Sequence, residues 1–397
     1  MITQPWKSRR RRRKSNPSPS VFFPDEVITD ILSWLPVKPL MKMKTVSKSS
    51  KTLISDSKFI KMHFNRSYAR NPHFSLVTYK KPTQKDDYSF VPFPVTDLLE
   101  NRCIVIPNDP YYRLDDKECR EVIGSCNGLV CVLGYDKKVM WLRFWNPATR
   151  KISNKLGYLF NVNYRSNLWR FVFCYDNSTD TYKVVSLHYA SNKPNVSIFS
   201  LADNVWRSIQ SFPLVPLQVL SSYRKLYDGV QFSCTVNWLA PKWSPNFDND
   251  HCVIISLDLI TETYTQFMLP PSVENLAPSS NICVLMNSFC FSHDSNKTDF
   301  VIWKMMEFGD DKSWTQFHKF SYHNLRMNDR LRFDPVSLNL KPLHISENGD
   351  TVVFVNCLQD KAILYNLRND SVQKSRVNHK ICWFSINDYV ESLVSAW

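Results

Sequence analysis

The chain has 397 residues, of which 43% are hydrophobic and 22% charged, and this composition excludes a wholly disordered chain. The 7 glycines argue against a glycine-rich phosphate loop as the organising feature, and no uninterrupted apolar run is long enough to predict a membrane span. The net charge of +14 arises mainly before residue 67, because residues 67–397 hold 35 basic and 32 acidic residues and so lack the basic bias of a nucleic-acid-binding body.

Residues 1–20 form a cationic tail with seven lysines and arginines and no acid. Mutual repulsion and the flanking prolines predict a disordered, solvated segment. The tail is a candidate nuclear import signal or a nonspecific anchor for RNA or acidic lipid, and a solvated tail without a receptor fits it equally well. It has too few apolar residues for a mitochondrial presequence. The candidate import residues are Arg9, Arg10, Arg11, Arg12, Arg13 and Lys14.

Eleven cysteines are irregularly spaced, and no pair has the Cys-x-x-Cys interval. Together with the lack of an apolar signal segment, the odd number predicts free thiols in a reducing compartment, the nucleus and/or the cytoplasm. The nine histidines form no metal-binding motif. We therefore expect no metal site and no cofactor.

A first helix is predicted after Pro24, because Asp25 and Glu26 suit the positive end of a helix dipole. Pro36 ends this helix. Its apolar positions recur at i, i+3, i+4 and i+7 and form one stripe: Ile28, Ile31, Leu32 and Leu35.

Three more short helical stretches are predicted before residue 67, at 40–45, around Leu53 and Ile54, and from Phe59 to His63. Such a set of short helices buries too little apolar surface to fold alone. The stripe on the first helix therefore needs cover from another protein or from the rest of this chain, and the pattern leaves both alternatives open.

The residues from Phe23-Pro24-Asp25-Glu26-Val27-Ile28 to Leu35-Pro36-Val37-Lys38-Pro39-Leu40, and onward to Phe59, follow in an order and spacing that resembles the F-box. The resemblance implies a helical bundle over residues 21–66. This bundle would dock on the Skp-type adaptor of a cullin–RING ubiquitin ligase, with the cullin reached only indirectly. The adaptor-binding residues that it implies are Phe23, Pro24, Ile28, Ile31, Leu32, Leu35, Pro36 and Leu40.

Three positions depart from the usual F-box pattern. Ser50 stands where Trp is usual, Ser47 where Cys is usual, and Lys42 where Arg is common. Loss of a Trp from so small a bundle predicts lower stability, since large-to-small core changes cost about 3–5 kcal/mol unless the site collapses. The departures bear on adaptor affinity and leave the identity of the motif intact.

Residues 67–397 alternate short Val-, Ile-, Phe-, Tyr- and Trp-rich runs with polar turns, which predicts an all-β domain. Units near positions 145, 198, 256, 301 and 364 are 45 to 63 residues apart, a loose period that suits about six or seven propeller blades. The fold class is therefore mainly β with a small helical motif at the N-terminus. Several units begin a turn with Asp or Asn, whose side chain caps the backbone: Asn146, Asp176, Asp258 and Asn366.

The same region carries Gly124-Ser125-Cys126-Asn127-Gly128, Trp145-Asn146-Pro147-Ala148-Thr149-Arg150, Asp180-Thr181-Tyr182-Lys183 and Tyr389-Val390-Glu391-Ser392-Leu393. In this order these residues resemble the plant F-box-associated domain. The resemblance implies a kelch-like β-propeller over residues 67–397 that recruits a protein substrate. It names neither the substrate nor the residues that bind it.

The run from Gly124 to Gly128 also mimics a nucleophile elbow with Cys126 at its centre. That chemistry needs a strand–turn–helix context, a nearby histidine and an orienting acid. The following residues, Leu129 to Leu133, predict a strand, so a tight turn is the preferred interpretation and a cysteine hydrolase the alternative.

These observations predict a non-catalytic substrate-recognition subunit of an SCF (Skp–cullin–F-box) ubiquitin ligase, which bridges the Skp-type adaptor and a protein substrate. The alternative is a protein- or nucleic-acid-binding propeller outside the ligase, with the helices packed on their own chain and an Arg-rich nuclear tail. No membrane partner is expected, and the near-neutral body disfavours nucleic acid.

Overall fold

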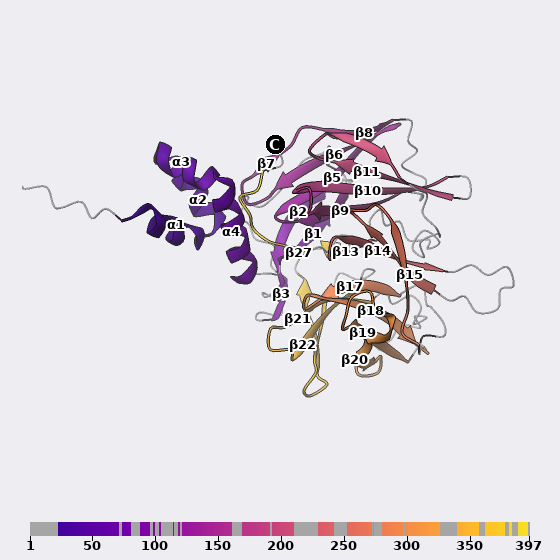
Figure 1. Cartoon of the computed structure of the whole chain (residues 1–397). Coiled ribbons are helices and arrows are strands. Elements are labelled where there is room, and N and C mark those ends of the chain that lie inside the picture. The colour runs from indigo at the N-terminus through magenta and orange to yellow at the C-terminus, as the bar shows by residue number, and fades with distance from the viewer. Residues whose placement is uncertain are drawn as a thin grey trace, which may run out of the picture.

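The computed structural model describes residues 23–70, 74–80, 88–95, 98–99, 103–104, 114, 118–119, 121–160, 169–190, 193–209, 229–241, 252–271, 273, 280–296, 298–325, 340–356, 362–377, 381–382 and 388–395. The predicted import residues 9–14 lie outside this set. Helices open the described chain, and antiparallel sheets make up most of the rest (Figure 1). The four helices are α1 (Asp25–Ser33), α2 (Val37–Met43), α3 (Lys48–Ser55) and α4 (Ser57–Arg70). Helix α4 runs four residues past the predicted boundary at 66, because no helix breaker occurs before Pro72.

Within the residues described above, six sheets of four or five strands follow, a number equal to the lower of the two predicted numbers of blades. Five of them are consecutive meanders. They comprise β4 (Glu121–Cys126), β5 (Leu129–Asp136), β6 (Val139–Asn146), β7 (Lys151–Ile152) and β8 (Leu156–Phe160); β9 (Trp169–Asp176), β10 (Thr181–Ala190), β11 (Lys193–Ser200) and β12 (Val205–Ser208); β13 (Val230–Phe232), β14 (Thr235–Pro241), β15 (Cys252–Asp258) and β16 (Tyr264–Met268); β17 (Asn281–Leu285), β18 (Ser288–Ser295), β19 (Asp299–Met305) and β20 (Trp314–Ser321), with the 3-10 helix η3 (Asp311–Ser313); and β21 (Leu340–Ile345), β22 (Thr351–Asn356), β23 (Ala362–Asn366) and β24 (Val372–Lys374).

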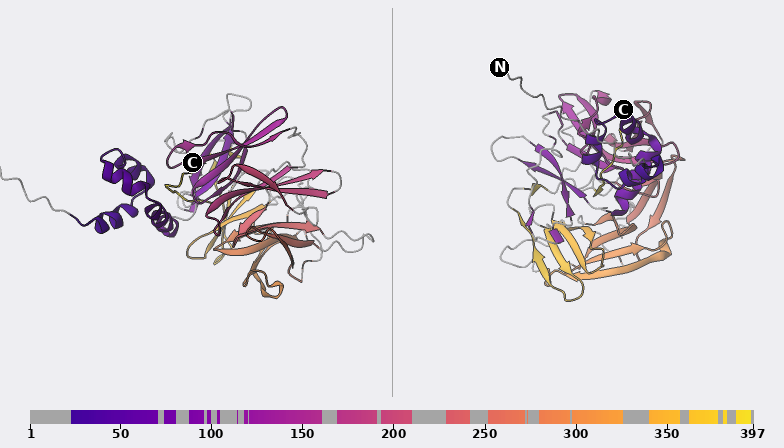
Figure 2. Two further views of the ribbon diagram at one scale, coloured as in Figure 1. Left: turned by 45° about the horizontal axis from the view of Figure 1, so that its top comes forward. Right: turned by 90° about the vertical axis from the view of Figure 1, so that its left-hand side faces the viewer.

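The sixth sheet joins the two ends of the domain. It pairs β1 (Phe74–Lys80) with β2 (Tyr88–Pro94) on one side and with β26 (Ile381–Cys382) and β27 (Asp388–Tyr389) on the other. A short parallel pair, β3 (Cys103–Ile104) and β25 (Arg376–Val377), also links the two ends. The strands β27, β4, β9, β13, β17 and β21 contact one another in this order, and the sheets follow one another around a ring (Figure 2).

The predicted repeat units are confirmed as structural equivalents. Positions 145, 198, 256, 301 and 364 fall in β6, β11, β15, β19 and β23, the third strand of five successive sheets. The sequence period did not reveal the sixth sheet, because its strands come from both ends of the domain. Buried clusters rich in aromatic and branched side chains join neighbouring sheets, as where Phe144 packs near Phe173 with ring centroids 5.6 Å apart.

The predicted Asp/Asn turns are also confirmed. At Asn146, Asp176, Asp258 and Asn366, a backbone N–H two or three residues later donates to the side-chain oxygen at 2.7–3.0 Å. The residue four places after each has a left-handed φ of 52–60°, which closes the chain into a tight hairpin.

Tight turns are concentrated on one side of the ring. Among the residues that the structure describes, ten of the twelve non-glycine residues with positive φ lie between the first and second or the third and fourth strands of a sheet, and in a meander these turns share a side. The helices lie on this side, where Lys61 Nζ is 3.0 Å from Asp180 Oδ2 and Tyr68 OH donates to Asn287 Oδ1 at 3.0 Å. The strand ends on the opposite side are separated by longer stretches of sequence, such as 21 residues between β12 and β13 and ten between β14 and β15.

Candidate functional site

Helix α1 forms as its sequence predicts. Pro24 precedes it with extended backbone, Asp25 and Glu26 occupy its first turn, and the helix ends at Ser33. Acidic side chains at this end are stabilised by the helix dipole. In Figure 1, α4 lies nearer to the sheets than α1 does.

The predicted apolar stripe divides between two environments. Leu32 is buried in the core of the bundle, Ile28 and Leu35 are half-buried against that core, and Ile31 is 52% exposed. The stripe therefore covers part of the chain's own core and leaves one edge open to solvent. Helical periodicity could not predict which residue took which side, because that depends on where α2 and α4 pack.

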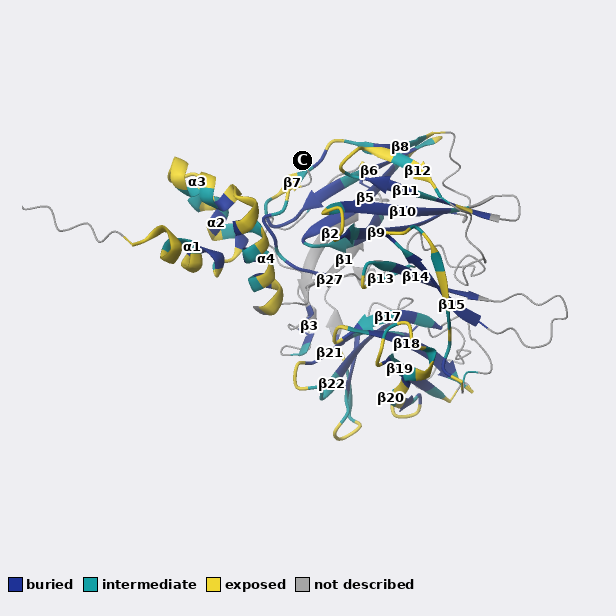
Figure 3. Cartoon of the chain, in the orientation of Figure 1, coloured by how far each residue is buried: buried dark blue, intermediate teal, exposed yellow. Residues whose placement is uncertain are grey.

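The open edge continues into a row of four large apolar residues in and next to α1 that are exposed, and the ribbon of α1 is coloured as exposed along much of its length in Figure 3. Val27, Ile31 and Trp34 belong to this row because they recur at i, i+4 and i+7. The same spacing is present in the sequence, but the prediction followed the stripe of more typical core residues instead. The row consists of Phe23 at 56%, Val27 at 40%, Ile31 at 52% and Trp34 at 48% exposure. Full burial of one such side chain contributes a favourable free energy of about 1.5–3 kcal/mol.

Arg66 of α4 fixes one end of this row. Its guanidinium carbon lies 4.7 Å from the centre of the Trp34 ring, and its Nη2 is 2.7 Å from Asp30 Oδ1. Nη1 donates to the carbonyl oxygen of Asp30 at 3.0 Å and also to Ser33 Oγ. One cation thus positions the indole ring and ties α1 to α4.

The remaining predicted adaptor-binding residues differ in exposure. Phe23, Pro24 and Pro36 are exposed, whereas Leu40 is buried beside Leu32. The structure thus gives Leu32 and Leu40 a packing role within this chain, because their side chains are covered by it. The adaptor-binding role of the predicted set stays a prediction.

The departures at Ser47 and Ser50 have a local explanation. Ser47 caps the N-terminus of α3, where its Oγ accepts a hydrogen bond from the Ser50 backbone N–H at 3.0 Å. Ser47 Oγ also donates to Ser50 Oγ at 2.9 Å, and Ser50 is half-buried. Serine is favoured at this position because its oxygen satisfies an otherwise unpaired N–H.

The run around Cys126 is a β-hairpin, as the turn interpretation predicts. β4 ends at Cys126, Asn127 and Gly128 adopt positive φ of 47° and 81°, and β5 begins at Leu129. Burial raises the pKa of the Cys126 thiol to about 12, so the thiol stays protonated at neutral pH and is a poor nucleophile. The strand–turn–helix context of the hydrolase alternative is not present at these residues.

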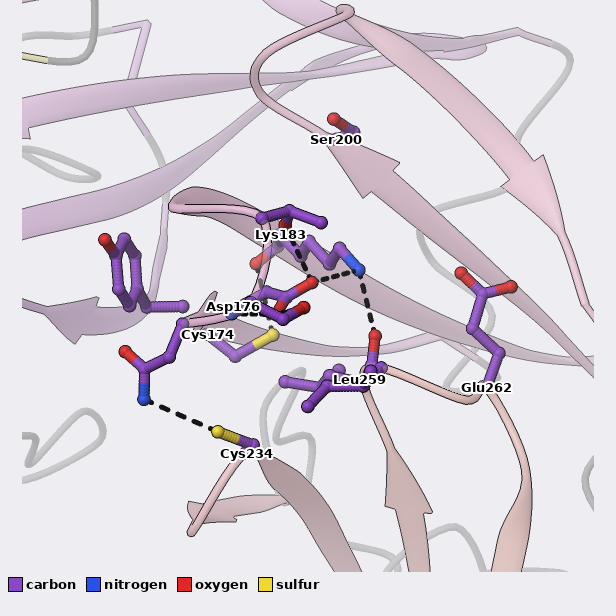
Figure 4. A network of polar contacts seen from close by, with 12 residues as sticks. Cys174, Asp176, Lys183, Ser200, Cys234, Leu259 and Glu262 are labelled. Carbon is purple, nitrogen blue, oxygen red and sulfur yellow. Dashed lines mark hydrogen bonds and ion pairs between the residues drawn. The ribbon is translucent and has the colours of Figure 1, made fainter.

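A buried ion pair joins two neighbouring sheets (Figure 4). Lys183 Nζ lies 2.7 Å from Asp176 Oδ2 and donates to the carbonyl oxygen of Leu259 in the next sheet at 2.9 Å. Ser178 and Thr179 donate to the same carboxylate at 2.6 and 2.7 Å. Although burial alone raises the pKa of Asp176, the hydrogen bonds from Lys183, Ser178 and Thr179 outweigh it and lower this pKa well below its usual value. Every group is satisfied locally, so the cluster is a structural link.

Within the described ranges, no group of three or more His, Cys, Asp or Glu side chains is placed to hold a metal ion. In the same part of the chain, no helix is both long and apolar enough to cross a membrane.

Two protein families match the chain. The F-box domain matches residues 23–62, and the F-box associated beta propeller domain matches residues 87–396. The chain belongs to the F-box-associated β-propeller family. The F-box and the propeller, predicted by resemblance, are therefore confirmed.

The relatives of this F-box protein include other F-box proteins of Arabidopsis thaliana. One F-box/kelch-repeat protein is 27% identical over 74% of this chain and 78% of its own length. The F-box protein CPR1 is 26% identical over 74% of this chain and 71% of its own length.

Solved structures match at greater distance. The β-propeller domain of the Trilobed protease from Pyrococcus furiosus is 12% identical, with a TM-score of 0.38, over 76% of this chain and 83% of that chain. A chain of a Nidogen/Laminin complex is 8% identical, with a TM-score of 0.41, over 81% of this chain and 99% of that chain. At such scores these likenesses carry no further argument.

Proposed function

We propose that this F-box protein is the substrate-recognition subunit of an SCF ubiquitin ligase. In this proposal the outward face of α1 binds the Skp-type adaptor, the cullin is reached through that adaptor, and the propeller captures a protein substrate for ubiquitination. The observation that carries the proposal is the row of exposed large apolar side chains that consists of Phe23, just before α1, and of Val27, Ile31 and Trp34, which recur at the helical spacing i, i+4 and i+7. Such a continuous apolar face is typical of a helix that docks on a partner.

The protein contributes to ubiquitin transfer by tethering and performs no bond chemistry. Binding one partner at the helices and another at the propeller raises their effective concentration at each other. In this proposal the substrate binds on the side of the propeller away from the helices, because the F-box does not cover that side and the strand ends there are separated by the longer stretches of sequence.

Co-purification of the full-length protein with a Skp-type adaptor tests the proposal. Ile31→Lys places a charge at the centre of the exposed row and should abolish adaptor retention, while folding is unaffected because the position is 52% exposed. Ile260→Lys is the matched control, since Ile260 is 54% exposed on the propeller, and it should leave retention intact. A charge at Leu32 is a poor test, because this buried residue supports the bundle. Failure of the wild-type protein to retain the adaptor would overturn the proposal.

We further propose that the protein works in the nucleus and/or the cytoplasm, with the run from Arg9 to Lys14 as its import signal. Deletion of residues 7–14 should shift a fluorescent fusion from the nucleus to the cytoplasm. An unchanged distribution would contradict this role of the tail.

A further inference from the structure

The last described residues form an extended segment between the propeller and the helices, drawn in yellow in Figure 1. The segment follows directly from β27, the strand that brings the C-terminal end of the chain into the ring-closing sheet. Because successive side chains of an extended chain point in opposite directions, residues 390–394 can contact both neighbours at once.

One set of contacts ties this segment to the propeller. Ser392 Oγ donates to the carbonyl oxygen of Asn127 at 2.9 Å. Asn146 Nδ2 donates to the carbonyl oxygens of Ser392 at 3.0 Å and Val394 at 2.7 Å. Val394 also packs against the buried cluster between the β4–β8 and β9–β12 sheets.

The residues in between contact the helices. Leu393 is buried in the same cluster as Leu32, Val37, Leu40, Ile54 and Phe59, and Ala148 from the β6–β7 turn joins it there. Glu391 Oε2 accepts a hydrogen bond from the Val37 backbone N–H at the start of α2, at 3.3 Å. Residues 391 and 393 thus contact the F-box, while residues 392 and 394 contact the propeller.

We propose that residues 390–394 form a two-sided connector that completes the core of the F-box and fixes its position on the propeller, with Leu393 as the positioning residue. A bundle of this size lacks enough core to be rigid alone, and the propeller supplies the missing apolar contacts through Leu393 and Ala148. Two further contacts, between Lys61 and Asp180 and between Tyr68 and Asn287, join α4 to the β9–β12 and β17–β20 sheets.

This arrangement couples closure of the ring to placement of the F-box. The strand that closes the ring, β27, carries the connector into position, so a chain whose ring is open lacks the Leu393 contact. This consequence rests on the proposed function. In a protein whose propeller is incompletely folded, the adaptor-binding face would have no fixed position relative to a bound substrate.

Hydrogen–deuterium exchange on the full-length protein, with mass-spectrometric detection, tests the connector without any adaptor. Leu393→Ala should speed amide exchange in α2, α3 and α4 at least tenfold and leave β9 to β20 within twofold of the wild type. Ile363→Ala is the control, because it truncates a buried apolar side chain in the β21–β24 sheet outside the connector, and it should leave exchange in the helices unchanged. Leu393→Val, a smaller truncation, should give an intermediate increase and serves if Leu393→Ala does not fold.

Unchanged exchange in the helices of Leu393→Ala would overturn the proposal, and so would an equal increase in helices and sheets, because that indicates general destabilisation. If the wild-type protein fails to retain a Skp-type adaptor while Leu393→Ala still loosens only the helices, the connector stands and the ligase function falls.

Discussion

The helical bundle and the propeller differ in how much of their apolar surface they bury. Of the thirteen large hydrophobic residues that are exposed in the described part of the chain, six lie within residues 23–70 and seven in the much longer propeller. The propeller buries clusters between successive sheets, whereas the bundle has one small core that borrows Ala148 and Leu393 from the propeller. The propeller therefore has enough core to be stable by itself, whereas the bundle is completed by contacts on both of its sides.

Removal of the buried carboxylate of Asp176 should destabilise the propeller strongly. Asp176→Asn leaves Lys183 buried without its counter-ion and should lower the free energy of unfolding by about 3–5 kcal/mol, as measured by urea denaturation at pH 7. Asp180→Asn in the same turn is the control, because Asp180 is exposed, and it should cost less than about 1 kcal/mol.

The ion pair of Asp176 and Lys183 also predicts how the stability of the propeller falls at acid pH. The pKa of Asp176 is lowered in the folded state, so its stabilisation is present above the unfolded pKa of about 3.9. This stabilisation is lost as the pH falls below that value towards the lowered pKa. Urea titrations from pH 7 down to pH 2.5 should show a smaller acid destabilisation in Asp176→Asn than in the wild type, and equal slopes would contradict the assignment.

A second substitution in the propeller should increase stability. Partial burial raises the pKa of Glu121 to about 7, above the value of an exposed carboxyl, so its carboxylate form opposes folding increasingly as the pH rises from about 4.5 through 7. Glu121→Gln should therefore stabilise the protein by up to about 3 kcal/mol at pH 8 and by little at pH 4. A gain that does not depend on pH would refute this explanation.

The turn at Gly128 offers a smaller, local test of how tightly the propeller holds the connector. Gly128 has φ +81°, and a Cβ there would lie 2.1 Å from Ser392 Oγ. Gly128→Ala should cost about 1–3 kcal/mol through strain and displacement of Ser392, whereas Gly309→Ala, whose nearest neighbour would be 3.7 Å from the new Cβ, should cost less. The midpoints of thermal unfolding of the two variants test this difference, and an equal decrease in both would contradict it.

The smallest effect concerns the bundle. Ser47→Ala removes the cap of α3 and should cost that helix about 1 kcal/mol, seen as roughly fivefold faster amide exchange in α3 with the sheets unchanged. Ser47→Asp, which retains a capping oxygen, should restore protection. Unchanged exchange in Ser47→Ala would show that the bundle is more rigid than its core implies.

Much of this architecture follows from local sequence. The bounds of α1 are set by Pro24, its two acids and Pro36, and the repeat of polar turns located the third strand of five sheets. Local patterns could not divide the α1 stripe between Ile31 and Leu32, because this depends on packing by distant helices. Sequence patterns also could not show that Leu393 enters the F-box core or that β27 closes the ring, since both contacts join residues more than 300 positions apart.

If one side of α1 binds the adaptor and the other supports the bundle core, calorimetric titration of purified Skp-type adaptor into full-length variants should separate the two roles. Ile31→Ala should weaken binding roughly ten- to hundredfold, the equivalent of one buried apolar side chain, with unchanged amide exchange in the bundle. Leu32→Ala should instead speed exchange throughout the bundle, because it leaves a cavity in the core. Wild-type affinity in Ile31→Ala would contradict the account.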